Sequence, residues 1–169
     1  DFMEVPVKGY HRLYPGNEIR LKGAYYVKAV SIDKDENGNI VAVHCTYDPE
    51  SRGGETPDGR KVKGTSHWVS AKYNIKAEIR QYDKLFKAEI PGASTGNYLD
   101  DINPDSLIVL KDSVIEEEAK NAKVGDYLQF VRNGYYCVDC KDSTPEHMVF
   151  NRTVTLKDSW SKMKAKMGL

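Results

Sequence analysis

Two cysteines in the stretch CVDC, Cys137 and Cys140, have the spacing of zinc and redox sites. A zinc site of this kind needs a second ligand pair, and the other candidates are the adjacent His44 and Cys45, which is not a usual ligand spacing. A redox CxxC opens a helix, whereas this pair lies in a predicted strand, where residues three apart point to opposite faces. We therefore expect structural thiols and no metal site.

A histidine in the stretch GRKVKGTSHWVSA, His67, lacks the partners that catalysis would require. A catalytic histidine needs a nucleophile or an acid in a fixed arrangement. The chain contains no G-x-S-x-G, and none of its cysteines lies in an activated context. A packed or hydrogen-bonded strand histidine is the better interpretation, and we expect no catalytic residue.

The charged residues argue against nucleic-acid binding by overall charge, because Lys+Arg and Asp+Glu both number 25. Their distribution is uneven. Residues 57–80 carry six cations against two acids, and residues 99–126 carry eight acids against three cations. This division predicts a basic face and an acidic one, although solvated surface is the commoner origin of such runs.

Side chains that could bind unpaired bases gather in two stretches. The first contains Tyr10, His11, Arg12, Tyr14, Arg20 and Lys22, and the second contains Gln129 and Arg132 beside a turn. Arginine forks and glutamine amides read base edges, and tyrosine rings stack on unpaired bases. The same mixture also occurs on ordinary amphipathic sheets, so composition leaves both interpretations open.

Many short strands must position these side chains. Period-two segments are expected at 17–33 around a glycine break, at 60–71, 76–86, 105–113 and 147–156, and on both sides of Asn37-Gly38 and Asn133-Gly134. Helix is expected only at 113–122 and in the tail, 157–169. This pattern indicates an all-β sandwich or barrel.

The chain has no apolar run long enough to span a bilayer and no signal-peptide pattern, and its three cysteines suggest a reducing compartment. We therefore expect a cytoplasmic protein that does not bind membranes. Because the sequence starts with DFMEVPVKGY and has no initiator methionine, we expect it to be a piece of a longer chain.

Seven stretches together resemble the C-terminal anticodon-binding region of glutaminyl-tRNA synthetase. They are YHRLYPGNEIRLKGAYYVKA, GNIVAVHCTYDPES, DGRKVKGTSHWVSA, EIRQYDKLF, INPDSLIVL, LQFVRNGYYCVD and VFNRTVTLKDSW, in the family's order and spacing over nearly the whole chain. The third stretch is the most specific. The resemblance implies two consecutive β-barrels of the ribosomal L25 type, with residues 1–65 in the proximal barrel and 66–147 in the distal one. Residues 148–169 would return to the proximal barrel and end in a short helix.

The resemblance also implies a function, which is binding of the anticodon loop of glutamine tRNA by a monomer. Ligation of glutamine, with ATP and magnesium, would belong to an N-terminal class I catalytic domain of the same chain. We expect this part to bind RNA, to hold no cofactor and not to catalyse. The alternatives are the equivalent region of an archaeal/eukaryotic-type glutamyl-tRNA synthetase and an L25-like barrel that binds structured RNA or protein.

The family's base-contacting positions carry over one at a time. Arg12 and Arg20 match arginines, Lys22 replaces a further arginine, Gln129 matches a glutamine that contacts the middle base, and Arg132 matches a nearby arginine. His11 and Gly9 depart from the residues of a family member, and Tyr10 completes the predicted set. Lys61, Lys63 and Lys157 are expected to contact phosphate rather than bases.

Overall fold

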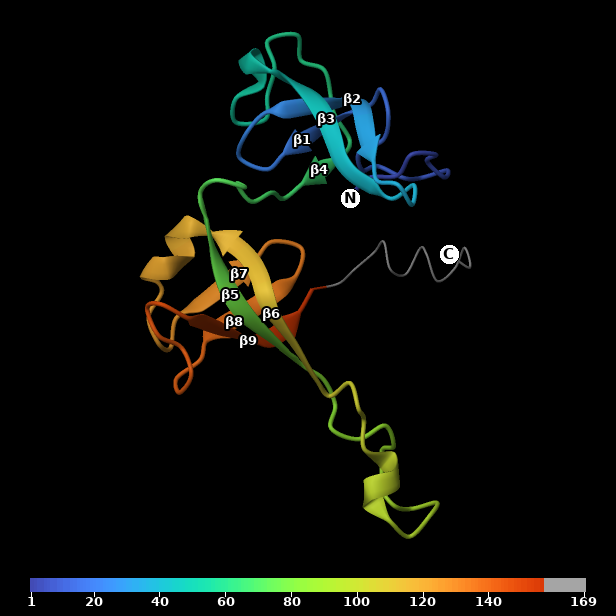
Figure 1. Cartoon of the computed structure of the whole chain (residues 1–169), viewed down its shortest axis with the longest axis vertical. Helices are drawn as coiled ribbons and strands as arrows, with labels where there is room; N and C mark the ends of the chain where they lie inside the picture. The colour runs from blue at the N-terminus through green and yellow to red at the C-terminus, as the bar shows by residue number, and fades with distance from the viewer. Residues whose placement is uncertain (157–169) are drawn as a thin grey trace. The chain divides into compact units, whose positions relative to one another are not determined.

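The chain forms two separate units in the computed structural model, which describes residues 1–156 (Figure 1). The first unit is Asp1–Trp68, and the second begins at Val69. The described elements are strands and short 3₁₀ helices, so the predicted all-β class is confirmed. Closure of either sheet into a barrel stays a prediction, and the expected C-terminal helix and Lys157 lie outside the described residues.

The first unit is built on a four-stranded sheet with the order β3-β2-β1-β4. Its strands are β1 (Glu18–Leu21), β2 (Tyr26–Lys34), β3 (Ile40–Asp48) and β4 (Thr65–Ser66). The predicted Asn37-Gly38 hairpin joins β2 to β3. Asp35 accepts the backbone N–H groups of Asn37 and Asn39 at 3.0 and 2.7 Å, and Gly38 adopts a φ of +81°.

The long strand expected at 60–71 is reduced to the two residues of β4. These residues pair in parallel with the end of β1, where Arg20 is opposite Thr65 and Leu21 is opposite Ser66. β1 contains only four residues before the chain turns at Gly23, so it offers few ladder partners. The expectation of a long returning strand was therefore wrong.

A loop that begins with the 3₁₀ helix η1 (Pro49–Ser51) covers one face of this sheet. Asp48 caps η1 by accepting the N–H of Glu50 at 2.9 Å. The Ser51 hydroxyl accepts the N–H of Tyr26 at 2.7 Å and donates to the carbonyl of Asp48 at 2.6 Å. These contacts hold the loop over β2, where Tyr26 is only 1% exposed.

The second unit is built on a five-stranded sheet with the order β6-β5-β9-β8-β7. Its strands are β5 (Asn74–Tyr82), β6 (Leu107–Glu116), β7 (Tyr127–Phe130), β8 (Gly134–Val138) and β9 (Met148–Thr155). The core cluster includes Ile79, Tyr136 and Phe150. The Phe130 ring stacks on Tyr136 at 4.5 Å and meets Phe150 edge-on at 5.2 Å.

Two expectations for this unit were wrong. The segment Met148–Thr155 does not return to the first sheet, because β9 pairs in parallel with β5 and antiparallel with β8. The segment 113–122 is not one helix, because β6 continues to Glu116 and only η3 (Glu117–Asn121) is helical. The β-branched residues Val114 and Ile115 pair with β5 and extend the strand.

β5 and β6 extend beyond the core as a long hairpin whose connection contains the 3₁₀ helix η2 (Tyr98–Asp101) (Figure 1). Asn97 caps η2 by accepting the N–H of Leu99. None of the helices within residues 1–156 has the length and apolar character needed to cross a bilayer.

Candidate nucleic-acid interface

Three of the predicted RNA-binding residues follow one another ahead of β1. Tyr10 is 7% exposed, and its burial raises the pKa of its hydroxyl. His11 is exposed, and the half-buried Arg12 forms an ion pair with Asp1. Tyr10 is therefore a core residue, while His11 presents its ring to solvent.

Gly64, just before β4, allows the segment around His11 to pack closely beside it. A Cβ at Gly64 would lie 2.2 Å from the carbonyl oxygen of His11 and 2.8 Å from Cγ2 of Ile19. A side chain would thus push the two segments apart. Gly64 was not among the predicted site residues, although glycine in a strand pattern signals close backbone approach.

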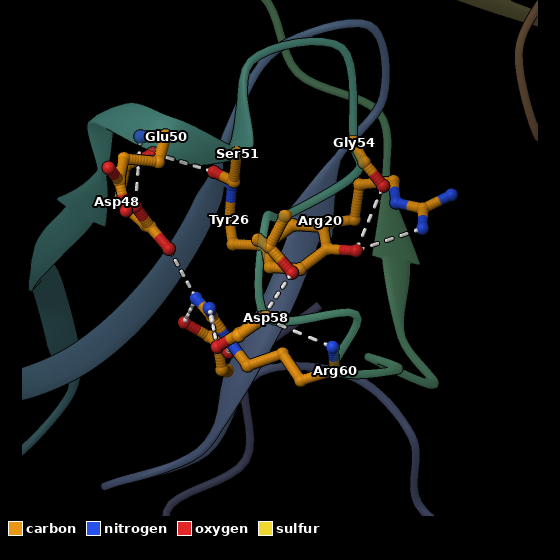
Figure 2. Close-up of polar contacts among 10 residues, drawn as sticks. Arg20, Tyr26, Asp48, Glu50, Ser51, Gly54, Asp58 and Arg60 are labelled. Carbon is orange, nitrogen blue, oxygen red and sulfur yellow. Dashed lines mark hydrogen bonds and ion pairs between the residues drawn. The ribbon is translucent and has the colours of Figure 1, made fainter.

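Arg20 lies on the face of β1 that the loop after β3 covers (Figure 2). Its Nη2 donates to the hydroxyl of Tyr26 at 3.1 Å, and that hydroxyl donates to the carbonyl of Gly54 at 2.8 Å. The guanidinium carbon lies 5.4 Å from the centre of the Tyr26 ring. Neither Tyr26 nor Gly54 was predicted to belong to the site.

Arg60 lies equally close to the Tyr26 ring, at 5.4 Å, but carboxylates surround it (Figure 2). It donates to both oxygens of Glu18 at 2.9 and 3.0 Å, to Asp58 at 2.7 Å, and to Asp48. These hydrogen bonds, those to Glu18 foremost, raise the pKa of Arg60. They fix the loop to β1, and they use the hydrogen-bond donors of this guanidinium within the protein.

Asp58 is itself strongly stabilised as a carboxylate. Its pKa falls to about 2, chiefly because the Thr56 hydroxyl donates to it, and also because the backbone N–H and guanidinium of Arg60 do so. The same guanidinium lowers the pKa of Asp48, together with the N–H of Glu50. All three carboxylates around Arg60 therefore help to hold the loop in place.

Three lysines of the first unit extend into solvent. Lys22, Lys61 and Lys63 are exposed, and none has an ion-pair partner among residues 1–156. The backbone of Lys22 is fixed by two contacts, since its N–H donates to Ser66 and its carbonyl accepts the indole N–H of Trp68 at 3.1 Å. These ammonium groups remain suited to phosphate.

The predicted basic face stays a prediction, but carboxylates neutralise part of its charge. Arg60, Lys61 and Lys63 belong to the first unit, whereas Lys72, Lys76 and Arg80 belong to the second. Arg80 pairs with Glu78 at 2.7 Å and with Asp142 at 2.6 Å, and Lys76 lies 3.6 Å from Asp112. Counting charges along the chain could not reveal these pairings, because most partners are distant in sequence.

Gln129 and Arg132 belong to the β7–β8 hairpin of the second unit. Gln129 is exposed and opposite Tyr135, which is 41% exposed, while Tyr127 on the same strand is 73% exposed. Arg132 lies in the three-residue turn with a φ of +69°, so strand alternation does not govern its direction. The two tyrosines flanking Gln129 were not predicted.

Cys137 and Cys140 are free thiols, as is Cys45. Cys137 lies near the end of β8, and Cys140 is exposed beyond it. No group of three or more His, Cys, Asp or Glu side chains within residues 1–156 could hold a metal ion. His67 is exposed in the segment after β4, where it takes part in an interaction of its own.

The predicted site residues thus form two groups, one in each unit. Tyr10, His11, Arg12, Arg20, Lys22, Lys61 and Lys63 belong to the first unit, and Gln129 and Arg132 belong to the second. The first group offers exposed lysines and an arginine without a carboxylate partner among the described residues. The second offers an amide with an exposed tyrosine two residues before it on β7 and another opposite it on β8. Both combinations suit unpaired, negatively charged nucleic acid.

Two family models match the chain, at residues 1–48 and 65–139. Both describe the anticodon-binding domain of class I tRNA synthetases for E and Q, glutamate and glutamine.

Curated relatives agree with these matches. The glutamine--tRNA ligase of Clostridioides difficile is 51% identical over 164 residues, which cover 97% of this chain and 30% of that protein. The glutamine--tRNA ligases of Stutzerimonas stutzeri and Azotobacter vinelandii are 49% and 51% identical over 96% of this chain and 29% of their own lengths. The chain therefore spans just under a third of the relatives it matches.

The two matched regions together cover well over half of the chain, and they lie one in each unit except for four residues at the boundary, 65–68. The resemblance seen in the sequence is thereby confirmed, and the chain belongs to the family of anticodon-binding domains of class I glutamyl- and glutaminyl-tRNA synthetases.

Proposed function

We propose that this chain binds the anticodon loop of a glutamine tRNA as part of a longer glutamine--tRNA ligase. The observation that carries the proposal is the identity of about half of all residues to glutamine--tRNA ligases over nearly the whole chain. Ligation, with its ATP and magnesium, would take place in other parts of the longer protein. A cytoplasmic, monomeric protein fits the same proposal.

The geometry supports base reading by a few residues and electrostatic docking by others. Arg20 and Gln129 offer planar groups that form paired hydrogen bonds with base edges. Lys22, Lys61 and Lys63 offer exposed point charges that attract phosphate without reading sequence. Arg12 enters this scheme already paired with Asp1, so RNA would have to compete with that carboxylate.

Binding to an anticodon stem-loop of glutamine tRNA tests the proposal. The 169-residue chain is titrated with the stem-loop at two salt concentrations, with the middle anticodon uridine intact or replaced. A clear preference for the intact loop, lost in Gln129→Ala, is the expected result. Equal binding to both loops that disappears at the higher salt would contradict base recognition and leave only docking. A glutamate tRNA stem-loop provides the comparison with the related synthetase.

A further inference from the structure

We propose that Tyr26 and Gly54 are positioning residues that hold the guanidinium of Arg20 in its RNA-binding orientation. The inference rests on the proposed function and adds two residues to it. Neither would itself contact a base in this scheme. Instead, a buried hydroxyl and a missing side chain together determine where Arg20 lies (Figure 2).

Gly54 provides the space that the Arg20 side chain occupies. A Cβ at Gly54 would lie 2.8 Å from Cδ, 2.8 Å from Nε and 3.2 Å from Cζ of Arg20. Gly54 also has a φ of +96°, a conformation that side chains with a Cβ rarely adopt. The Arg20 side chain thus packs directly against the loop backbone, and any larger residue at position 54 would displace the Arg20 side chain.

Tyr26 fixes the end of the same side chain. Its hydroxyl donates to the carbonyl of Gly54 at 2.8 Å and accepts from Nη2 of Arg20 at 3.1 Å. The tyrosine cannot readily move, because it is 1% exposed and its backbone N–H is held by the Ser51 hydroxyl at 2.7 Å. One hydroxyl therefore joins the loop to the arginine.

The contacts that remain open on Arg20 suggest why it is held this way. The guanidinium has no carboxylate partner among residues 1–156, whereas its Nε is buried against Gly54 and is out of reach of a ligand. Arg60, at the same distance from the same ring, is paired with three carboxylates. An arginine that served only to hold the loop would be expected to resemble Arg60. Arg20 instead keeps a positive charge that no carboxylate within residues 1–156 balances, and a base edge or phosphate would satisfy it.

A double-mutant cycle between Tyr26 and Arg20 tests the inference. Binding of the 169-residue chain to the glutamine anticodon stem-loop is measured for the unsubstituted chain, Tyr26→Phe, Arg20→Ala and the double variant. A hydrogen bond to a charged group contributes enough for about a tenfold weakening by Tyr26→Phe. If the tyrosine acts through Arg20, the same substitution should leave the affinity of Arg20→Ala unchanged.

Thr56→Val is the matched control. It removes a hydroxyl of the same loop, which donates to Asp58 at 2.6 Å, and it contacts neither Tyr26 nor Arg20. Thermal melting of every variant, followed by circular dichroism, shows the loss of stability that both hydroxyl deletions share. We expect Thr56→Val to lower the melting temperature with less than a twofold change in RNA affinity. Gly54→Ala supplies a second test that keeps every hydroxyl, and it should weaken RNA binding to the same extent as Arg20→Ala.

Each outcome decides between the two proposals. If the unsubstituted chain does not prefer the glutamine stem-loop, both the proposed function and the inference fail. If it does, and Arg20→Ala is weaker, the inference alone is overturned when Tyr26→Phe and Gly54→Ala bind like the unsubstituted chain. It is also overturned when Tyr26→Phe weakens Arg20→Ala by the same factor as the unsubstituted chain, because the tyrosine would then act only through general stability.

Discussion

At the residue scale, Arg60 and its neighbours Lys61 and Lys63 carry like charges in very different surroundings. Arg60 meets the carboxylates of Glu18, Asp48 and Asp58, whereas both lysines are exposed and have no such partner among the described residues. Charge–phosphate contacts release counterions, so only a cation that reaches phosphate contributes to the salt dependence of binding. The two kinds of cation should therefore respond differently to substitution.

The salt dependence of RNA affinity separates them. For single-stranded nucleic acid, each phosphate contact contributes about 0.7 to the slope of log affinity against log salt. The double variant Lys61→Gln/Lys63→Gln should lower that slope by about 1.4 and leave the melting temperature nearly unchanged. Arg60→Gln should leave the slope unchanged and lower the melting temperature. The assignment would be wrong if Arg60→Gln reduced the slope as the lysine variant does.

Asp139 gives the second unit a carboxylate that is stabilised in its ionised form. Its pKa falls to about 2, because the N–H of Asp142, the amide of Asn151 and the N–H of Lys141 donate to it. A lowered pKa in the native state means that ionisation stabilises the fold above about pH 4, and that this stabilisation is lost as the pH falls towards 2.

The variant Asp139→Asn tests this pH dependence. The difference in free energy of unfolding between the unsubstituted chain and Asp139→Asn should be largest near neutral pH and shrink between pH 4 and 2. Chemical denaturation at a series of pH values measures it. A difference that stays constant over this range would show that ionisation of Asp139 does not contribute.

At the scale of elements, the β7–β8 hairpin shows what turn chemistry could predict. The Asn133-Gly134 signal correctly indicated a hairpin, but the turn consists of residues 131–133, and Gly134 already belongs to β8. The left-handed residue is Arg132, with a φ of +69°. Arginine is not typical of that conformation, so no local pattern could locate it. The ring stacking of Phe130 on Tyr136, across the strands, helps to set the register.

Substitutions at Arg132 can separate its backbone conformation from its side chain. Asparagine tolerates positive φ, whereas the β-branched valine does not. Arg132→Asn should keep the stability of the chain within about 0.5 kcal/mol and weaken binding of the glutamine stem-loop. Arg132→Val should weaken binding similarly and also destabilise the chain, by about 1–2 kcal/mol. Equal stability of the two variants, measured by denaturation, would show that the turn can relax.

Long-range strand pairing accounts for the elements that sequence could not place. The alternation of β9 predicted a strand, yet the same pattern fits either sheet, and only the structure shows that it joins β5 and β8. The segment around β4 presents the opposite case. Its sequence predicts a long strand, but only two residues of β1, Arg20 and Leu21, pair with it. Local patterns predict that a segment is extended, whereas the partner depends on packing between distant residues.

At the scale of the whole molecule, each unit has a core of its own. The first contains Tyr10, Ile19, Tyr26 and Ala29 as buried apolar residues, and the second contains the larger cluster around Phe150. The sequence resemblance anticipated two consecutive bodies, but composition alone did not, since strands recur along the entire chain. The pairing of β9 within the second sheet explains why the segment Met148–Thr155 belongs to that core.

Separate cores predict separate responses to core substitutions. Phe150 is completely buried, and removing a buried phenylalanine costs about 3–5 kcal/mol. Phe150→Ala should therefore lower hydrogen-exchange protection of amides in β5, β8 and β9 and leave β1 and β2 protected. Ile19→Ala, at a residue 2% exposed, should have the reverse effect and costs about 2–5 kcal/mol. If either variant lowered protection in both sheets equally, the two cores would unfold as one cooperative unit, because local stability follows cooperative boundaries rather than sequence.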